Sequence, residues 1–217
     1  MVTSAMGARE ARALWSAADP ALWRAALDAY PAVIDAQGAK DLARLDRWYR
    51  ADLPATLHGR QPAFLEPDEL VDAVRWKMIR GEWRPRNLAI VRGNDPATVR
   101  SASERAFALV PDPRKPLGAL SELAGVGPAT ASAVLAAYRP HVYPFLDDVV
   151  ASAAPDLGEP RFTVAYYVRY AEALCRLADE LGPGWTAQSV GFALWSAAGG
   201  KRRPAASGHP APRDAAG

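Results

Sequence analysis

The apolar residues of this chain recur at helical spacing along almost its whole length. The clearest example is the segment Thr163–Leu181, whose apolar stripe consists of Val164, Tyr167, Val168, Ala171, Leu174, Ala178 and Leu181. Residues three and four apart share one face of a helix. No alternating strand pattern of useful length and no internal repeat accompany this period, so the predicted fold class is all-α.

Residues typical of helix ends divide this pattern into separate helices. Asp19 and Pro20 suit the N-cap and the first position of one helix, with Leu22 and the neighbouring alanines as its expected apolar stripe. The segment Glu66–Glu69 places acids in the first turn of another helix, where the helix dipole favours them. Further helices are predicted over Asp41–Tyr49, from Asn94 towards Phe107, and over Leu117–Leu123, Pro128–Tyr138 and Trp185–Trp195.

The composition suits one folded domain over residues 1–200. Half of the residues are hydrophobic and 23% are charged, which is ordinary for a globular protein. The segment Lys201–Gly217 has no apolar period and is rich in Pro, Ala and Arg, so we predict a disordered basic tail there. The net charge of +2 permits nucleic-acid binding without demanding it.

Residues that usually hold metal ions are scarce in the sequence. Cys175 is the only cysteine, which excludes intrachain disulfides and a four-cysteine iron–sulfur cluster. His58, His141 and His209 are widely spaced, so we expect no histidine-built metal site and no cofactor. No apolar run reaches the length of a membrane span and the N-terminus has no signal-peptide core, so the protein is predicted to be soluble and cytoplasmic.

A tight turn is predicted at Gly125-Val126-Gly127-Pro128, between two helices. Glycine supplies the positive φ that such a reversal needs, and Pro128 suits the first turn of the second helix. The amides of the turn and of the following helix then point outwards together, which makes an anion site for a nucleic-acid phosphate. The hydroxyl of Thr130 is placed to add a contact. A hairpin of two helices with no ligand is the alternative.

Three features follow the turn in a fixed order. They are Thr130-Ala131, an apolar helix that ends at Tyr138, and the run Pro144-Phe145-Leu146-Asp147-Asp148. Together with the glycine turn they resemble the helix-hairpin-helix superfamily of DNA glycosylases, in which an essential aspartate follows the hairpin. Upstream, Val74–Asn94 contains a W-K-x-x-R-G-x-x-R-P block similar to that of a poorly characterised branch that lacks the iron–sulfur cluster.

The resemblance implies a helical bundle of two subdomains around a cleft, acting as a monomer on damaged or distorted duplex DNA. Such a protein hydrolyses the N-glycosidic bond of a flipped, damaged base during base-excision repair, in association with the nucleoid. Bifunctional members carry a lysine nucleophile where this chain has Ala129, so we expect a monofunctional hydrolase without Schiff-base lyase activity. A non-catalytic protein that binds DNA structures is the main alternative, and an all-α scaffold for other proteins is a third.

Two adjacent aspartates compete for the catalytic role. The spacing of 20 residues from Gly127 selects Asp147, whereas the local Phe-Leu-Asp-Asp pattern favours Asp148. We choose Asp148 and keep Asp147 as the alternative. A carboxylate beside the anomeric carbon stabilises the positive charge that develops on the sugar. Either aspartate could instead cap the helix beginning near Val149, and the segment Val149–Ser152 departs from the family's usual Thr-His-Val run.

Cationic and aromatic residues supply the remaining candidates. Lys77, Arg80 and Arg84 of the upstream block, and Lys115 before the hairpin, are candidates for phosphate contacts, with a solvated face as the alternative. The predicted DNA contacts therefore comprise Gly125, Val126, Gly127, Ala129, Thr130, Lys115, Lys77, Arg80 and Arg84. Tyr143 and Trp83 are candidates for the walls of a base pocket, and core packing is the alternative for both.

Overall fold

The computed structural model describes residues 2–201 of the chain, with side chains described from Gly7 onwards. Within that range every regular element is a helix and no strand occurs, which confirms the predicted all-α class. None of the helices between residues 2 and 201 is both long enough and apolar enough to cross a membrane. The predicted disordered tail lies outside the described residues from Arg202 to Gly217.

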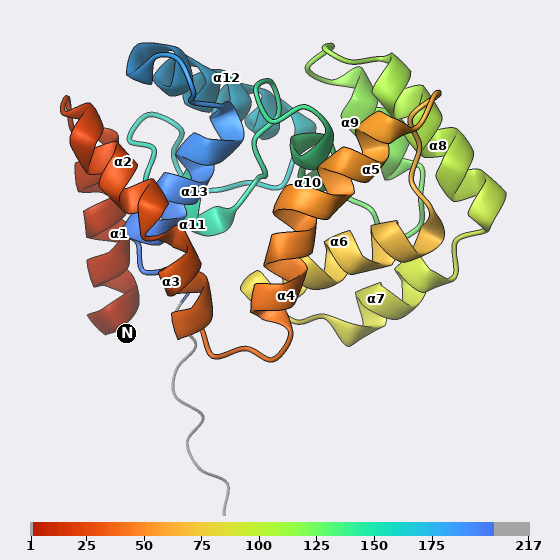
Figure 1. Cartoon of the computed structure of the whole chain (residues 1–217), viewed down its shortest axis with the longest axis horizontal. Helices are drawn as coiled ribbons and strands as arrows, with labels where there is room; N and C mark the ends of the chain where they lie inside the picture. The colour runs from red at the N-terminus through yellow and green to blue at the C-terminus, as the bar shows by residue number, and fades with distance from the viewer. Residues whose placement is uncertain (1, 202–217) are drawn as a thin grey trace, which may run out of the picture.

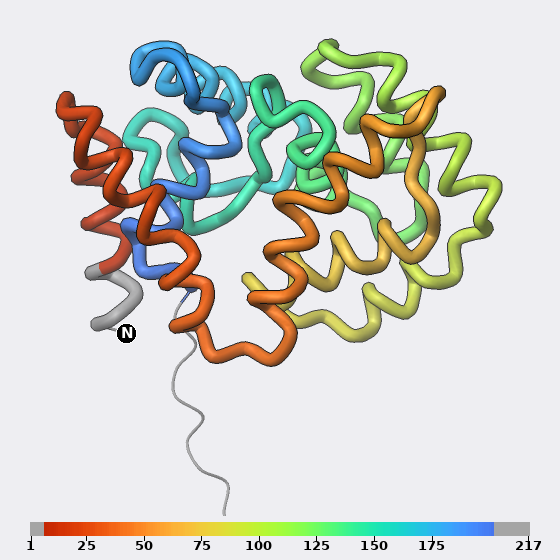
Figure 2. Tube along the Cα trace, in the orientation of Figure 1, coloured from red at the N-terminus to blue at the C-terminus, as the bar shows by residue number. Residues whose placement is uncertain are grey.

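The helices form two groups that face each other (Figure 1). The first group is built from both ends of the chain, so that the N-terminal helices lie beside the C-terminal one (Figure 2). Its central helix is α13, which contacts all the others in the group. The members are α1 (Val2–Trp15), α2 (Pro20–Asp28), α3 (Tyr30–Ala36), α11 (Asp148–Ala151), α12 (Val164–Leu181) and α13 (Ala187–Ala197).

The second group comprises the middle of the chain. Its members are α4 (Leu42–Arg47), the π-helix η1 (Trp48–Asp52), α5 (Leu53–Gly59), α6 (Pro67–Arg80), α7 (Pro85–Arg92), α8 (Pro96–Ala108), α9 (Lys115–Ser121) and α10 (Pro128–Tyr138). Helix α6 contacts α4, α7, α8 and α10 and is the centre of this group. Contacts between α3 and α4 join the two groups, and one hydrophobic core runs through both.

The helix boundaries follow the capping residues seen in the sequence. The side chain of Asp19 accepts a hydrogen bond from the amide of Ala21 at 2.9 Å, and Glu66 forms a capping box with Glu69 at the start of α6. The expected apolar stripe of α2 is wrong, because Trp23 is its buried residue whereas Leu22 is 54% exposed. An indole buries much more apolar area than the alanines do, so it decides which face of this short helix turns inwards.

A chain of buried polar side chains ties the two groups together. Arg80 on α6 donates to Asp147 Oδ2 at 3.1 Å and to the hydroxyl of Tyr30 on α3. The hydroxyl of Tyr30 donates in turn to Asp46 Oδ1 at 2.7 Å, which also accepts from Trp76 Nε1 at 2.9 Å. Buried polar groups cost free energy unless they are hydrogen-bonded. This chain satisfies its members and fixes how α3, α4, α6 and the start of α11 meet.

Candidate active site

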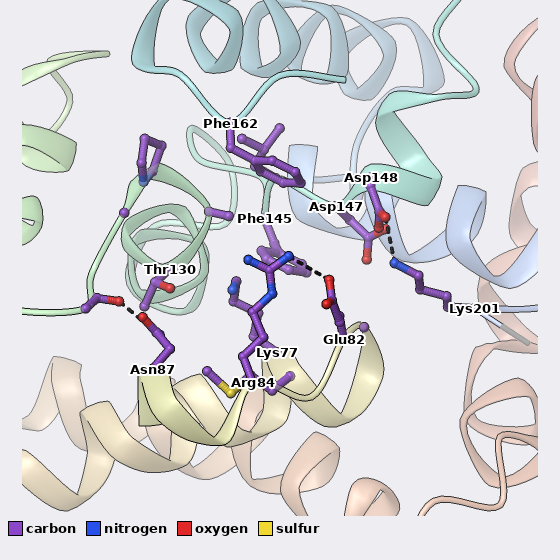
Figure 3. A pocket seen from close by; sticks show the side chains of 17 residues that line it. Lys77, Glu82, Arg84, Asn87, Thr130, Phe145, Asp147, Asp148, Phe162 and Lys201 are labelled. Atoms are coloured by element: carbon purple, nitrogen blue, oxygen red, sulfur yellow. Dashed lines mark hydrogen bonds and ion pairs between the residues drawn. The ribbon is translucent and has the colours of Figure 1, made fainter. Parts of the chain in front are cut away.

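A cavity of about 420 Å³ lies between the two groups of helices. Its size falls within the range of about 300–1,000 Å³ that is usual for ligand sites. Figure 3 shows the side chains that surround it. The lining residues come from α6 and the segment after it, from the α9–α10 turn, and from the opposite group: Lys77, Met78, Gly81, Glu82, Arg84, Asn87, Gly125, Gly127, Pro128, Ala129, Thr130, Phe145, Leu146, Asp147, Asp148, Phe162 and Lys201.

The turn between α9 and α10 is held from behind by two asparagines. Gly125 has φ +77, and its carbonyl accepts a hydrogen bond from Asn87 Nδ2 at 3.2 Å. Asn94 binds both backbone groups of Ala124, at 2.8 Å to the amide and 2.9 Å to the carbonyl. The predicted positive φ at the turn is therefore confirmed. The asparagines, which sequence reasoning missed, hold the turn at the cavity wall.

Only part of the predicted anion site is available at this turn. The amide of Val126 donates to the carbonyl of Leu123, and the amide of Thr130 donates to the carbonyl of Gly127. Those two amides are satisfied within the protein, and the side chain of Val126 is buried, which contradicts its predicted DNA contact. The amides of Gly127 and Ala129 have no partner among the described residues. Together with the Thr130 hydroxyl, they remain the groups that an anion in the cavity could meet.

Substituting Gly125 by alanine should lower the free energy of unfolding by at least about 2 kcal/mol. The left-handed backbone costs a residue with Cβ about 1–2 kcal/mol, and the new Cβ would lie 2.8 Å from Val91 Cγ2, an overpacking that adds to the cost. Urea unfolding measures the effect. Gly118→Ala is the matched control, because nothing lies within 4 Å of its Cβ position in α9 and alanine is the better helix former. Equal stability of the two variants would contradict the prediction.

The two adjacent aspartates have different surroundings. Asp147 is the N-cap of α11, where its Oδ1 accepts from the amide of Val149 at 2.9 Å, while its Oδ2 accepts from Arg80. Its side chain is only 7% exposed. The side chain of Asp148 is 43% exposed and pairs through Oδ2 with Lys201 Nζ at 2.6 Å. Both line the cavity (Figure 3), but only Asp148 has a carboxylate oxygen without a protein partner among the described residues.

Burial has the largest effect on the pKa of Asp147. Removal from water raises the pKa of Asp147 above its ordinary value, and the neighbouring Asp148 adds to this increase, while Arg80 and the Val149 amide oppose it. Burial also disfavours the charge of Arg80, but Tyr30, Asp147 and Asp46 outweigh that effect and raise the pKa of Arg80. Arg80 therefore stays a cation, and Asp147 serves mainly as its counter-ion and as a helix cap.

Arg80 does not face the cavity. It is 3% exposed, and its guanidinium carbon lies 4.0 Å from the ring centroid of Trp195 and within 6 Å of the rings of four further aromatic residues. The predicted phosphate contact of Arg80 is wrong, because the guanidinium is enclosed by rings and by Asp147. Trp76, four residues earlier on the same helix face, is equally buried and stacks on Tyr49 with centroids 3.6 Å apart.

Lys77 and Arg84 are the cations of the upstream block that line the cavity (Figure 3). Lys77 is half-buried, and burial together with Arg84 lowers the pKa of its ammonium, while Asp148, Asp147 and Glu82 oppose the shift. Arg84 is exposed and pairs with Glu82 at 2.6 Å. Glu82 lines the same wall and offsets the charge of Arg84.

Three predicted residues are not among those that line the cavity. Lys115 begins α9 at the end remote from the turn and pairs with Asp112 at 3.5 Å. Tyr143 is buried and donates its hydroxyl to the carbonyl of Asp112 at 2.8 Å, so core packing accounts for it. Trp83 is 42% exposed and does not line the cavity. The predicted role of Tyr143 as a base-pocket wall is therefore wrong, whereas the role of Trp83 stays a prediction.

Two further cavity residues were not predicted from the sequence. Phe162 is 53% exposed, which is unusual for a phenylalanine, and its ring forms part of the cavity wall. It stands alone in an irregular segment, so no period reveals it. Lys201 was assigned to the tail by composition, yet it lines the cavity beside Asp148.

Comparisons with family models, with curated proteins and with solved structures return no match to this chain. Among residues 2–201 no group of three or more His, Cys, Asp or Glu side chains is arranged to hold a metal ion.

Proposed function

We propose that this protein is a monofunctional DNA glycosylase of the helix-hairpin-helix type, which hydrolyses the N-glycosidic bond of a damaged base flipped out of duplex DNA. The observation that carries the proposal is the position of Asp148. Its half-exposed carboxylate shares one cavity with the glycine turn between α9 and α10. A phosphate held at that turn and a sugar beside Asp148 are the two contacts that such a reaction needs.

The chemistry follows from the carboxylate. As the bond between C1′ and the base nitrogen breaks, the base leaves with the bonding electrons and positive charge develops on the sugar. The Asp148 carboxylate stabilises that charge and accepts a proton from the water that attacks C1′. Position 129 is an alanine, so the hairpin contributes no amine, and water is the nucleophile in base release.

The groups available for DNA are the amides of Gly127 and Ala129, the Thr130 hydroxyl and the cation Arg84. In this proposal the turn amides and Thr130 bind a phosphate beside the flipped nucleotide, and Arg84 binds a second one. One molecule suffices, because all these groups come from a single chain. Binding should weaken as the salt concentration rises, since phosphate contacts release counter-ions.

Phe162 is the candidate for stacking on the flipped base. Phe162→Ala should lower the efficiency of base release by about 5- to 150-fold, corresponding to the roughly 1–3 kcal/mol of base–aromatic stacking. Leu22→Ala is the matched control, because Leu22 is 54% exposed, close to the 53% of Phe162, but lies on α2 outside the cavity. Single-turnover kinetics measure both variants, and an unchanged rate for Phe162→Ala would remove this residue from the site.

The proposed function is tested by base release from duplex oligonucleotides that each contain one alkylated, deaminated or oxidised base. The abasic product is revealed by alkaline strand cleavage, and DNA binding is measured on the same duplexes. We expect release of at least one base class. Tight DNA binding without release of any base would contradict the proposed glycosylase activity.

The Asp148–Lys201 ion pair favours a second candidate, a non-catalytic protein that binds junctions, nicks or distorted duplex. In that case the carboxylate serves only to hold Lys201 at the cavity. Affinity for such structures that is independent of Asp148, with no base release, would identify this function.

A further inference from the structure

The charged residues that line the cavity are paired, with one exception. Each of the three acids has a cation of its own among the described residues: Asp147 pairs with Arg80, Glu82 with Arg84, and Asp148 with Lys201. Lys77 forms no ion pair with a described residue, so its ammonium is the surplus charge of the cavity. Its side chain projects from α6 into the cavity, between the α9–α10 turn and Phe145 (Figure 3).

The cavity is poorly suited to a cationic ligand. Proteins recognise organic cations with the faces of aromatic rings, among which indole is the most effective. Among the described residues, no tryptophan or tyrosine lines the cavity, and the ring of Trp195 instead lies over the guanidinium of Arg80 at 4.0 Å. The rings that line the cavity are those of Phe145 and Phe162. A base can stack on a phenyl ring, but the described residues offer a positive charge neither an aromatic cage nor a carboxylate that lacks its own cation.

We propose that the ammonium of Lys77 selects neutral damaged bases that carry a carbonyl oxygen, such as deaminated and oxidised bases, over cationic alkylated bases. The inference rests on the proposed function, because it concerns the base that leaves when the glycosidic bond is hydrolysed. The ammonium attracts the oxygen of a neutral base and donates a hydrogen bond to it. It repels a base that already carries a positive charge. Lys77 is thereby the residue that sets the class of base.

The same ammonium assists the departure of a neutral base. As the bond between C1′ and the base nitrogen breaks, the base keeps the bonding electrons and becomes an anion whose charge is shared with the carbonyl oxygen. Lys77 stabilises this charge and donates a proton to the base. The attacking water adds to C1′ and gives its proton to Asp148, and exchange with solvent restores both side chains. A cationic base leaves as a neutral molecule, so it gains nothing from Lys77.

The surroundings of Lys77 make its ammonium a better proton donor. Burial and the nearby guanidinium of Arg84 lower the pKa of Lys77, while Asp148, Asp147 and Glu82 oppose this shift without cancelling it. A general acid is more effective the closer its pKa lies to the working pH. Release of a neutral base should therefore fall as the pH rises through the pKa of Lys77, which lies below the ordinary lysine value of about 10.4.

A phosphate contact, which the sequence led us to expect for Lys77, is the other use of an unpaired ammonium. Phosphate contacts position the DNA and carry no information about the base. Loss of such a contact would weaken the action on every damaged base alike. Loss of a contact to the base changes the order in which bases are preferred, so the two roles are separated by comparing bases of different charge.

The test measures single-turnover release by the full chain from duplexes that each contain one neutral base (uracil, hypoxanthine or 8-oxoguanine) or one cationic base (7-methylguanine). We expect the wild type to enhance release of at least one neutral base, over its spontaneous rate, more than release of 7-methylguanine. Lys77→Met should lower release of that neutral base by about 100- to 10,000-fold, the range for loss of a general acid. Release of 7-methylguanine by this variant should be unchanged or faster.

Two further variants control the experiment. Lys77→Arg keeps the positive charge and should recover part of the rate that Lys77→Met loses. Lys40→Met replaces an exposed lysine outside the cavity and should leave the release of both classes of base unchanged. The ratio of the two rates is the decisive quantity, because partial unfolding of a variant lowers both rates alike.

Three results would overturn the inference and leave the proposed function standing. Release of 7-methylguanine without release of any neutral base assigns the cavity to cationic bases. Undiminished release of a neutral base by Lys77→Met rejects the role of the amine. An equal loss for both classes of base shows that Lys77 acts through DNA binding or the fold and not through the base. Absence of release of any base by the wild type rejects the proposed function itself, and this inference with it.

Discussion

Replacing Asp148 by asparagine should lower the rate of base release by about 100- to 10,000-fold, the range that loss of a general base costs. Asparagine keeps the size of the side chain but loses the charge that stabilises the sugar and the basicity that activates water. Single-turnover release of a base from lesion-containing duplex measures the effect. DNA affinity should be unchanged or slightly higher, because a negative charge is removed near the phosphates.

Stability should not confound this experiment. The Asp148–Lys201 pair is about half exposed, and such pairs contribute about 0–1 kcal/mol. The N-cap of α11 is Asp147, so the helix start is retained in the Asp148 variant. Full activity of Asp148→Asn, with activity lost in Asp147→Asn at an unchanged unfolding free energy, would show that the catalytic carboxylate had been misassigned.

The parts of the site that sequence reasoning found are those that local rules determine. A positive φ at Gly125, the start of α10 at Pro128 and the cap at the start of α11 each depend on a few adjacent residues. Adjacent residues also decide which of the two aspartates caps a helix. Asp147 caps α11, while Asp148 lines the cavity with a carboxylate oxygen that has no partner among the described residues.

The residues that were assigned wrongly are those whose role depends on which face of a helix turns inwards. Lys77 and Arg80 belong to one basic block, yet Lys77 faces the cavity and Arg80 faces the core. Trp76 and Arg80 are four residues apart, so they share a face of the helix. Burial of the Trp76 indole therefore buries the Arg80 guanidinium as well. That signal was present in the sequence. What the sequence could not give is Asp147 and Tyr30 arriving from other helices to satisfy the buried cation.

Phe162 and Lys201 were missed for a different reason. Neither belongs to a periodic segment. Their place in the site follows only from the cavity that elements distant in the sequence form together. Local patterns carry no information about which irregular segments meet in space. In a cleft between two helical groups, the wall that the hairpin forms can therefore be predicted from the sequence. The residues of the opposite wall are identified only from the structure.

Breaking the buried ion pair between Arg80 and Asp147, behind the cavity, should strongly destabilise the fold. Arg80→Met should lower the free energy of unfolding at neutral pH by about 3–5 kcal/mol, because it leaves the carboxylate of Asp147 buried without its cation. Methionine suits the surrounding aromatic rings, so the loss comes from charge and not from a large void. Urea unfolding measures the change. Arg86→Met, at an exposed arginine on α7, is the control and should stay within about 0.5 kcal/mol of the wild type.

The same variant should recover stability as the pH falls. Burial already raises the pKa of Asp147, and Arg80 opposes that increase, so removing Arg80 raises the pKa further. A carboxyl whose pKa is higher in the folded than in the unfolded state stabilises the fold below its unfolded value of about 3.9, and this contribution is lost as the pH rises through the folded value. The deficit of Arg80→Met should thus be largest at neutral pH and shrink towards about pH 4.

A second substitution separates charge from packing. Asp147→Asn removes the uncompensated carboxylate, while the amide oxygen still accepts from Val149 and keeps the cap of α11. Arg80→Met combined with Asp147→Asn should therefore be more stable at neutral pH than Arg80→Met alone, and its stability should lose the excess pH dependence. If the double variant were the less stable of the two, Asp147 would be held by its hydrogen bonds and not by charge, and the role assigned to Arg80 would be wrong.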